Sequence, residues 1–213
     1  FVGRARGVSV SLPYFIPAPF YLGTFGAFIR MNGEVRSRSV YFDIGVAGPL
    51  AGLVVAVGAV IAGVAFAPAS VGGAHGMTPA SSFLFAALFR MAGGGDPSAM
   101  VALGPVAFAG WLGLLVTALN LIPVGQLDGG HIAYALWGGT RSRQLGSAVT
   151  AVMVGLGLVY SPHWIMWALL VWVVAGTGHP AARDEHTELS VGRRALAYGS
   201  FVLLAAIVLP WPT

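Results

Sequence analysis

The chain has 213 residues, of which 57% are hydrophobic and 8% are charged, far below the roughly 25% charge of an average soluble domain. We therefore expect an integral membrane protein. The absence of cysteine excludes thiolate metal sites and cysteine nucleophiles, so any metal must be bound by His, Asp or Glu. The net charge of +4 comes from arginines spread along the chain, which gives little support to a nucleic-acid partner.

Residues 1–43 are expected to form a membrane-associated segment with a strand-like loop. Pro13, Pro17 and Pro19 would interrupt helical hydrogen bonding, whereas residues 8–12 and 24–31 alternate or carry β-branched and aromatic side chains. Extended backbone at membrane depth must be satisfied by protein or by a water-filled cavity. The pattern predicts a small β-rich re-entrant or interfacial loop, whose strand edge could bind an extended peptide. The alternative is a loop that only packs at the interface.

Four or five later stretches are apolar enough to be membrane spans, namely 44–67, 101–122, 146–160, 164–176 and 195–210. The stretches 146–160 and 164–176 are shorter, and they could form either a tight helical hairpin or two separate spans. Residues 83–89 are too short to cross and are expected to be interfacial or re-entrant. Asp43, just before the first of these spans, could cap its helix. The patterns predict an all-α polytopic membrane protein with about five transmembrane helices, divided into segments 1–43, 44–137 and 138–213.

The arginines predict the orientation of the chain. With five spans, ten of the eleven arginines fall on one side of the membrane, and only Arg90 falls on the other. The positive-inside rule assigns the arginine-rich side to the cytoplasm. Asp128 is then near the cytoplasmic side of a multi-pass protein of the cell membrane.

An aspartate flanked by glycines follows the second long span, in the sequence NLIPVGQLDGGH at residues 120–131. A carboxylate near a span is costly in hydrocarbon and usually faces a cavity, a partner or an ion. Pro123 would end or bend the helix, and Gly129 and Gly130 permit close backbone approaches. By itself, an Asp-Gly-Gly sequence favours a helix cap at Asp128 over a functional carboxylate.

The longer motif around Asp128 favours a functional carboxylate over a helix cap. It reads N-x-x-P-x-x-x-L-D-G-G and consists of Asn120, Pro123, Leu127, Asp128, Gly129 and Gly130. At the end of a long apolar span, it resembles the third-ligand motif of the site-2 protease (M50-type) family of intramembrane zinc metalloproteases. The stretch Gly23-Thr24-Phe25-Gly26 and the span with Ala47-Gly48-Pro49 fit the same resemblance, which covers residues 1–134.

The resemblance implies a role for each matching residue. Asp128 would be the third protein ligand of a catalytic Zn²⁺. Asn120 would orient the substrate backbone or stabilise the oxyanion, with a hydrogen bond between helices as an equal alternative. The loop with Gly23 and Gly26 would bind the substrate in an extended form. The remaining motif residues would shape the helix break and let backbone and metal approach closely: Pro123, Leu127, Gly129 and Gly130.

In the family, two histidine ligands and a glutamate come from an H-E-x-x-H helix, and this motif is absent from the 213 residues. Because residues 1–7 resemble the segment directly after that helix, we expect the catalytic glutamate upstream of Phe1 and no catalytic residue within this chain. The chain alone should not hydrolyse peptides. The resemblance further implies a membrane-protein substrate, such as a single-span anti-sigma factor, and a prokaryotic plasma membrane whose lipid bilayer surrounds the spans.

Other classes of function compete with this interpretation. A catalytically inactive relative or scaffold would truly lack H-E-x-x-H. A transporter would also have broken helices and an intramembrane acid, but it predicts an internal repeat that we do not find. His131, three residues from Asp128, is a minor candidate ligand. The other histidines are expected in solvated or interfacial segments: His75, His163, His179 and His186.

Overall fold

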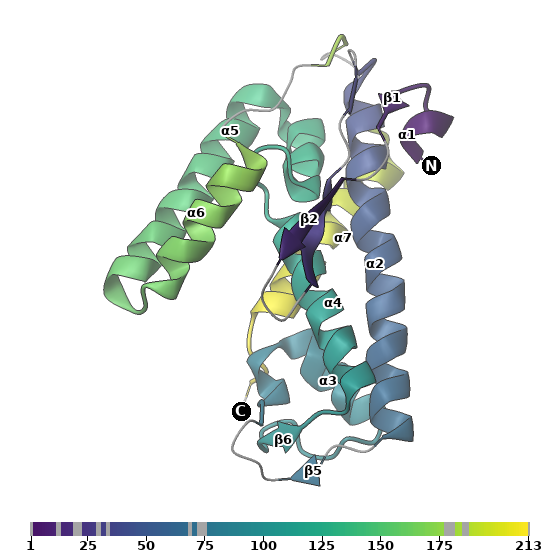
Figure 1. The fold of residues 1–213 in the computed structure, drawn as a ribbon. Helices are drawn as coiled ribbons and strands as arrows, with labels where there is room; N and C mark the ends of the chain where they lie inside the picture. Colours follow the sequence, from purple (N-terminus) through teal and green to yellow (C-terminus); the bar gives the residue numbers. More distant parts are fainter. Residues whose placement is uncertain are drawn as a thin grey trace. The chain divides into compact units, whose positions relative to one another are not determined.

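The computed structural model describes residues 2–11, 14–18, 23–28, 31–32, 35–67, 70–71, 76–176, 182–184 and 188–212. These residues are mostly helical (Figure 1). The chain divides into two compact units. The first unit is Phe1–Ala47 with Pro123–Arg194, and the second is Gly48–Ile122 with Ala195–Thr213. The three-segment division expected from the sequence stays a prediction.

The first unit begins with a short helix and a hairpin. Helix α1 (Val2–Ala5) ends where Gly7 adopts a positive φ of 74° and the Val8 N–H donates to the Gly3 carbonyl, a glycine-dependent helix end. Strands β1 (Ser9–Val10) and β4 (Met31–Asn32) pair antiparallel, as do β2 (Tyr14–Ala18) and β3 (Gly23–Phe28). The registers of the two pairs agree to within one residue.

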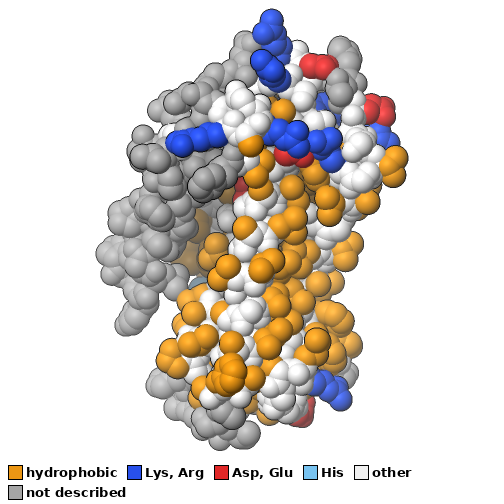
Figure 2. Space-filling view, turned by 90° about the vertical axis from the view of Figure 1, so that its right-hand side faces the viewer, with side chains coloured by type: hydrophobic (Ala, Val, Ile, Leu, Met, Phe, Trp, Pro, Cys, Tyr) orange, Lys and Arg blue, Asp and Glu red, His pale blue; other side chains and the backbone are white. Residues whose placement is uncertain are grey.

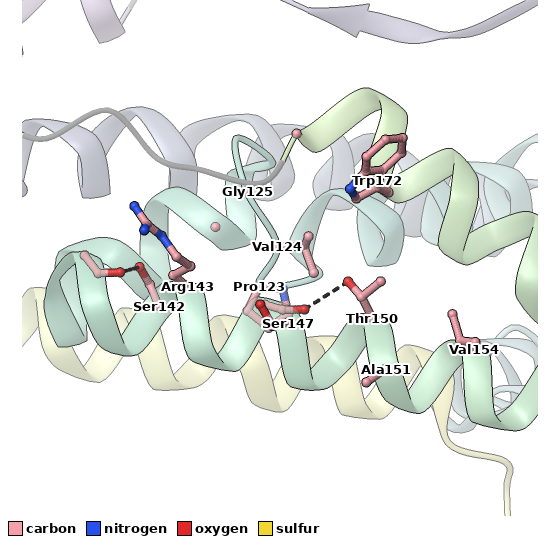
Figure 3. A pocket seen from close by; sticks show the side chains of 14 residues that line it. Pro123, Val124, Gly125, Ser142, Arg143, Ser147, Thr150, Ala151, Val154 and Trp172 are labelled. Atoms are coloured by element: carbon pink, nitrogen blue, oxygen red, sulfur yellow. Dashed lines mark hydrogen bonds between the residues drawn. The ribbon is translucent and has the colours of Figure 1, made fainter.

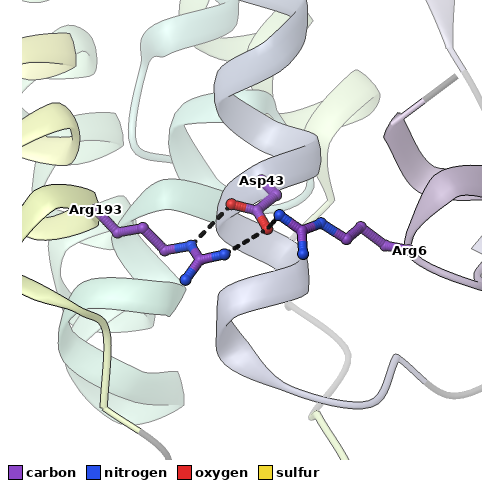
Figure 4. Close-up of polar contacts among 3 residues, drawn as sticks. All are labelled: Arg6, Asp43 and Arg193. Atoms are coloured by element: carbon purple, nitrogen blue, oxygen red, sulfur yellow. Dashed lines mark hydrogen bonds and ion pairs between the residues drawn. The ribbon is translucent and has the colours of Figure 1, made fainter.

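Helix α2 (Arg38–Phe66) starts in the first unit, where two residues of its first two turns make long-range polar contacts. The Arg38 guanidinium donates to the carbonyl of Ala135 at 2.6 Å. The carboxylate of Asp43 forms ion pairs with Arg6 and Arg193 (Figure 4). The expectation that Asp43 caps the first long helix is wrong, because the helix starts five residues earlier and Asp43 lies within it.

Helices α5 (Asp128–Val159) and α6 (His163–Ala175) lie side by side in the first unit (Figure 1). Gly138 interrupts α5 with φ 81° and ψ 176°, a conformation open mainly to glycine. The helix resumes directly after it, so Arg141 and Arg143 lie on α5 and not in a connection before a span at 146–160. Near the α5–α6 turn, a Cβ on Gly157 would lie only 2.8 Å from the backbone nitrogen of Ile165.

The second unit contains the rest of α2 with α3 (Phe83–Met91), α4 (Pro105–Leu121) and most of α7 (Val191–Val208). A short 3-10 turn, η1 (Pro79–Ser81), precedes α3, and strands β5 (Ser70–Val71) and β6 (Val101–Ala102) pair antiparallel. Small residues bring α2 and α4 together, since a Cβ on Gly63 would lie 2.2 Å from the nitrogen of Ala107. Phe85 and Phe89 bury α3 against the same core.

Three of the described helices are long and apolar enough to span a membrane, namely α2, α5 and α7, while α4 and α6 are shorter apolar helices. Large apolar side chains are exposed on these helices, including Val54 on α2, Leu158 on α5 and Val202 on α7. Figure 2 shows exposed apolar side chains over the middle of one face, with the charged side chains nearer its two ends. Such a surface suits lipid contact. The chain is a helical membrane protein, whereas the count of five spans and the membrane position of the hairpin stay predictions.

Candidate functional site

A break between two helices sets the position of Asp128. Helix α4 ends at Leu121, and α5 begins at Asp128. Pro123 has no N–H to continue the α4 hydrogen-bond pattern, and Gly125 has a positive φ of 50°. The backbone of the break is tied to α6, because the Gln126 N–H donates to the carbonyl of Ala175 at 2.9 Å. The helix break expected from Pro123 is therefore present.

The carboxylate of Asp128 lies in the first turn of α5. The residue in the cap position is Leu127, whose carbonyl accepts the N–H of His131, so Asp128 does not cap a helix that begins at Gly129. A negative charge in a first turn is favoured by the helix dipole. The Asp128 side chain is half-buried and makes no hydrogen bond or ion pair with any residue that the structure describes.

Two glycines allow the backbone to pack tightly around this aspartate. A Cβ on Gly130 would lie 2.2 Å from the carbonyl oxygen of Gly125 in the break. A Cβ on Gly45 of α2 would lie 2.8 Å from the carbonyl oxygen of Asp128. Real side chains do not occupy such positions, so both glycines are required for the close approach. The N-terminal part of α2 thus holds the start of α5 directly.

Aromatic residues surround the next turn of α5. His131 is buried and stacks on Tyr41 of α2, with ring centroids 5.4 Å apart. Tyr41 also meets Tyr134 edge-on, and the Tyr134 hydroxyl accepts the N–H of Ala182 at 2.7 Å. Sequence reasoning missed these tyrosines. The sequence did contain a signal for them, because a tyrosine in an apolar helix usually needs a hydrogen-bond partner for its hydroxyl.

The other predicted site residues are placed as follows. Asn120 is half-buried in the last turn of α4 and belongs to the second unit, whereas Asp128 belongs to the first. Gly23 pairs with Ala18 at the start of β3, and Gly26 lies where the register of β2 and β3 shifts. Contacts of these residues with a substrate stay predictions.

Among the motif-supporting residues, Pro123, Gly129 and Gly130 are buried, and Leu127 is half-buried. His163 is exposed, with a ring nitrogen 2.8 Å from the Ser161 hydroxyl. The remaining histidines lie outside the described residues: His75, His179 and His186.

The described residues do not form a complete metal site. No group of three His, Asp or Glu side chains in this part of the chain is placed to bind one ion. A catalytic zinc usually has three protein ligands and an open position. Asp128 can supply one such ligand, so a metal here would need further ligands from elsewhere.

These features define an apolar, helical membrane protein with a half-buried carboxylate at a helix break. The chain belongs to peptidase family M50, the site-2 protease family, whose family model matches residues 2–161. It is 31% identical over 220 residues to the probable chloroplastic zinc metalloprotease EGY2 of Oryza sativa subsp. indica, covering 98% of this chain and 39% of the relative. It is 33% identical over 213 residues to the probable chloroplastic zinc metalloprotease EGY1 of Arabidopsis thaliana, covering 96% of this chain and 38% of the relative.

A third similar protein is not named as a metalloprotease. The DDT domain-containing protein PTM of Arabidopsis thaliana is 33% identical over 164 residues, which cover 73% of this chain and 10% of that protein. The chain thus spans about two fifths of the length of the zinc metalloproteases that it matches. A comparison with solved structures gives no match.

Proposed function

We propose that this chain is part of an intramembrane zinc metalloprotease of the site-2 type, which hydrolyses a peptide bond within or near a transmembrane segment of a membrane protein. The observation that carries the proposal is the carboxylate of Asp128. It follows a helix break in an apolar chain of the M50 family and makes no polar contact with the described residues. An acid in that position is costly in a membrane unless it binds something.

The bound group in this proposal is zinc. Two similar proteins are named as probable zinc metalloproteases, and a carboxylate is an accepted zinc ligand. The 213 residues contain no H-E-x-x-H, and the described part has no group of three ligands. Asp128 is therefore proposed as one ligand of a zinc whose other protein ligands lie outside this sequence. It follows that these residues alone should neither hold a catalytic zinc nor cleave peptides.

The hairpin and α4 are proposed to bind the substrate. A substrate must be extended to be cut, because a helix shields its peptide bonds by internal hydrogen bonding. Strand β3, with Gly23 and Gly26, offers paired extended backbone in the same compact unit as Asp128. Strand addition to such an edge would align the substrate, and Asn120 would orient its backbone.

We propose a single-span membrane protein, such as an anti-sigma factor, as the substrate. The lipid bilayer surrounds both proteins. A prokaryotic plasma membrane is the proposed location, with Asp128 near the cytoplasmic side. Because the EGY relatives are named chloroplastic, fractionation of the source cells is the test of location.

The deciding experiment measures zinc content and cleavage in the longest natural protein that contains this chain. Asp128→Ala should weaken zinc affinity by at least the roughly 10–100-fold that the loss of even outer-shell partners costs in other zinc proteins, so the variant should retain less zinc. The matched control is Asp96→Ala, which removes an exposed carboxylate that accepts the N–H of Ser98 in a loop after α3. Equal zinc content in both variants would contradict the metal role of Asp128.

An inactive relative is the second candidate, and the absence of H-E-x-x-H from the 213 residues favours it. It predicts that the longest natural protein binds no stoichiometric zinc even when Asp128 is intact. In the same experiment, zinc in the unaltered protein supports the protease. Absence of zinc from the unaltered protein and from Asp128→Ala supports the inactive relative.

A further inference from the structure

A pocket of about 480 Å³ lies in the first unit, beside the second part of α5 (Figure 3). Its walls come from α5, from α6 and from the helix break at Pro123 to Gly125. All lining residues belong to the same compact unit. The pocket is large enough for part of an amphiphilic molecule. It lies along α5, a candidate membrane span, so molecules of the surrounding bilayer could reach it.

One end of the pocket offers a positive charge and a hydroxyl. Arg143 and Ser147 are four residues apart on α5, so they share one face of the helix. Neither side chain makes a hydrogen bond or ion pair with any residue that the structure describes. The hydroxyls of Ser142 and Thr150 are already used, since they donate to the carbonyls of Gly139 and Gly146. This leaves one cation and one hydroxyl to bind a ligand.

The other end of the pocket is apolar. Ala151 and Val154 continue the same side of α5, and Trp172 of α6 lies across from them. Figure 3 shows Arg143 and Val154 at opposite ends of the lining. At about 1.5 Å per residue, the eleven residue steps from Arg143 to Val154 span roughly 16 Å of helix. A ligand that follows this wall passes from a charged to a hydrophobic environment.

We propose that this pocket binds one anionic amphiphile, with its phosphate or carboxylate head on Arg143 and Ser147 and its hydrocarbon chain along Ala151, Val154 and Trp172. Arg143 provides charge-assisted hydrogen bonds to an oxyanion, and the indole of Trp172 suits the boundary between headgroup and hydrocarbon. An anionic phospholipid of the surrounding membrane has this chemistry. The inference concerns a lipid site and does not depend on the proposed protease activity.

The test measures lipid binding to the full chain in detergent micelles by native mass spectrometry. The probes are phosphatidylglycerol, phosphatidylcholine with the same acyl chains, and inorganic phosphate as competitor. Phosphatidylglycerol should bind at least about tenfold more tightly than phosphatidylcholine, a difference of about 1.4 kcal/mol. Arg143→Gln should remove most of this preference. Arg141→Gln is the matched control, because Arg141 is exposed on the same helix, has the same charge and does not line the pocket.

A second pair of variants tests the hydrocarbon end. Ala151→Phe would fill the apolar part of the pocket and should weaken phosphatidylglycerol binding several-fold, whereas Ala148→Phe, on an exposed position outside the lining, should not. The proposal is overturned if Arg143→Gln and Arg141→Gln have equal effects, or if phosphatidylcholine binds as tightly as phosphatidylglycerol. Complete displacement of the lipid by millimolar inorganic phosphate would also overturn it, because the site would then recognise a free anion.

Discussion

Replacing Asp43 with asparagine keeps the size of the side chain and removes its charge, which tests how strongly the first unit depends on one carboxylate. Asp43 of α2 lies 2.8 Å from the guanidinium of Arg6, in the turn after α1. It also accepts two hydrogen bonds from Arg193 of α7, at 2.9 and 3.0 Å (Figure 4). One carboxylate therefore joins three segments that are distant in the sequence.

The expected magnitude follows from the exposure of the three side chains. Asp43 is 14% exposed, whereas Arg6 is 48% and Arg193 30% exposed. Breaking a fully buried pair costs about 3–5 kcal/mol, and an exposed pair contributes about 0–1 kcal/mol. The solvent around both arginines places this cluster between those limits, at about 2 kcal/mol. For a chain of this size, that loss lowers the midpoint of thermal unfolding by about 4–8 °C.

The assay is the midpoint of thermal unfolding in detergent at one fixed heating rate. Glu188→Gln is the matched control, because its pair with Arg194 is far more exposed and should change the midpoint by less than about 2 °C. In the double variant Asp43→Asn with Arg193→Gln, the effects should not add, since both break the same contact. A midpoint for Asp43→Asn that matches the Glu188→Gln control would refute the reasoning.

Two further substitutions test the packing around Asp128, again by the midpoint of thermal unfolding. Gly45→Ala places a Cβ 2.8 Å from the carbonyl of Asp128 and should destabilise by about 1–3 kcal/mol, whereas Gly58→Ala on the same helix meets nothing within 4 Å and should be neutral or stabilising. Equal losses would show that α2 does not pack closely at Gly45. Tyr134→Phe leaves a buried backbone N–H without its acceptor and should cost about 1–2 kcal/mol. Tyr160→Phe, at an exposed position, should cost nothing measurable, and a similar loss there would point to a general effect of removing hydroxyls.

Some boundaries could not be predicted from hydropathy. Residues 138–145 are polar, with Arg141 and Arg143, and hydropathy therefore predicts a connection before a span at 146–160. The structure continues α5 through them, because arginine favours helix as well as apolar residues do and only Gly138 leaves the helical conformation. The start of α2 was misplaced for the same reason. Hydropathy detects the part of a helix that suits lipid, whereas hydrogen bonding decides where the helix begins.

The sequence by itself determined the membrane class, the apolar helices and the break before Asp128. Each of these depends on residues that are close in the chain: local hydropathy, the missing N–H of Pro123 and the conformational freedom of the adjacent glycines. The continuous motif from Asn120 to Gly130 likewise identified the family. Local chemistry was sufficient in each case.

Only the tertiary structure decided what these local features contact. Asp43 pairs with Arg193, 150 residues away, and Gly45 meets the start of α5 at Asp128. Sequence spacing carries no information about such partners, because they depend on how the helices pack after they form. The same reason applies to Arg143 and Trp172, which line one pocket only because α6 folds back along α5.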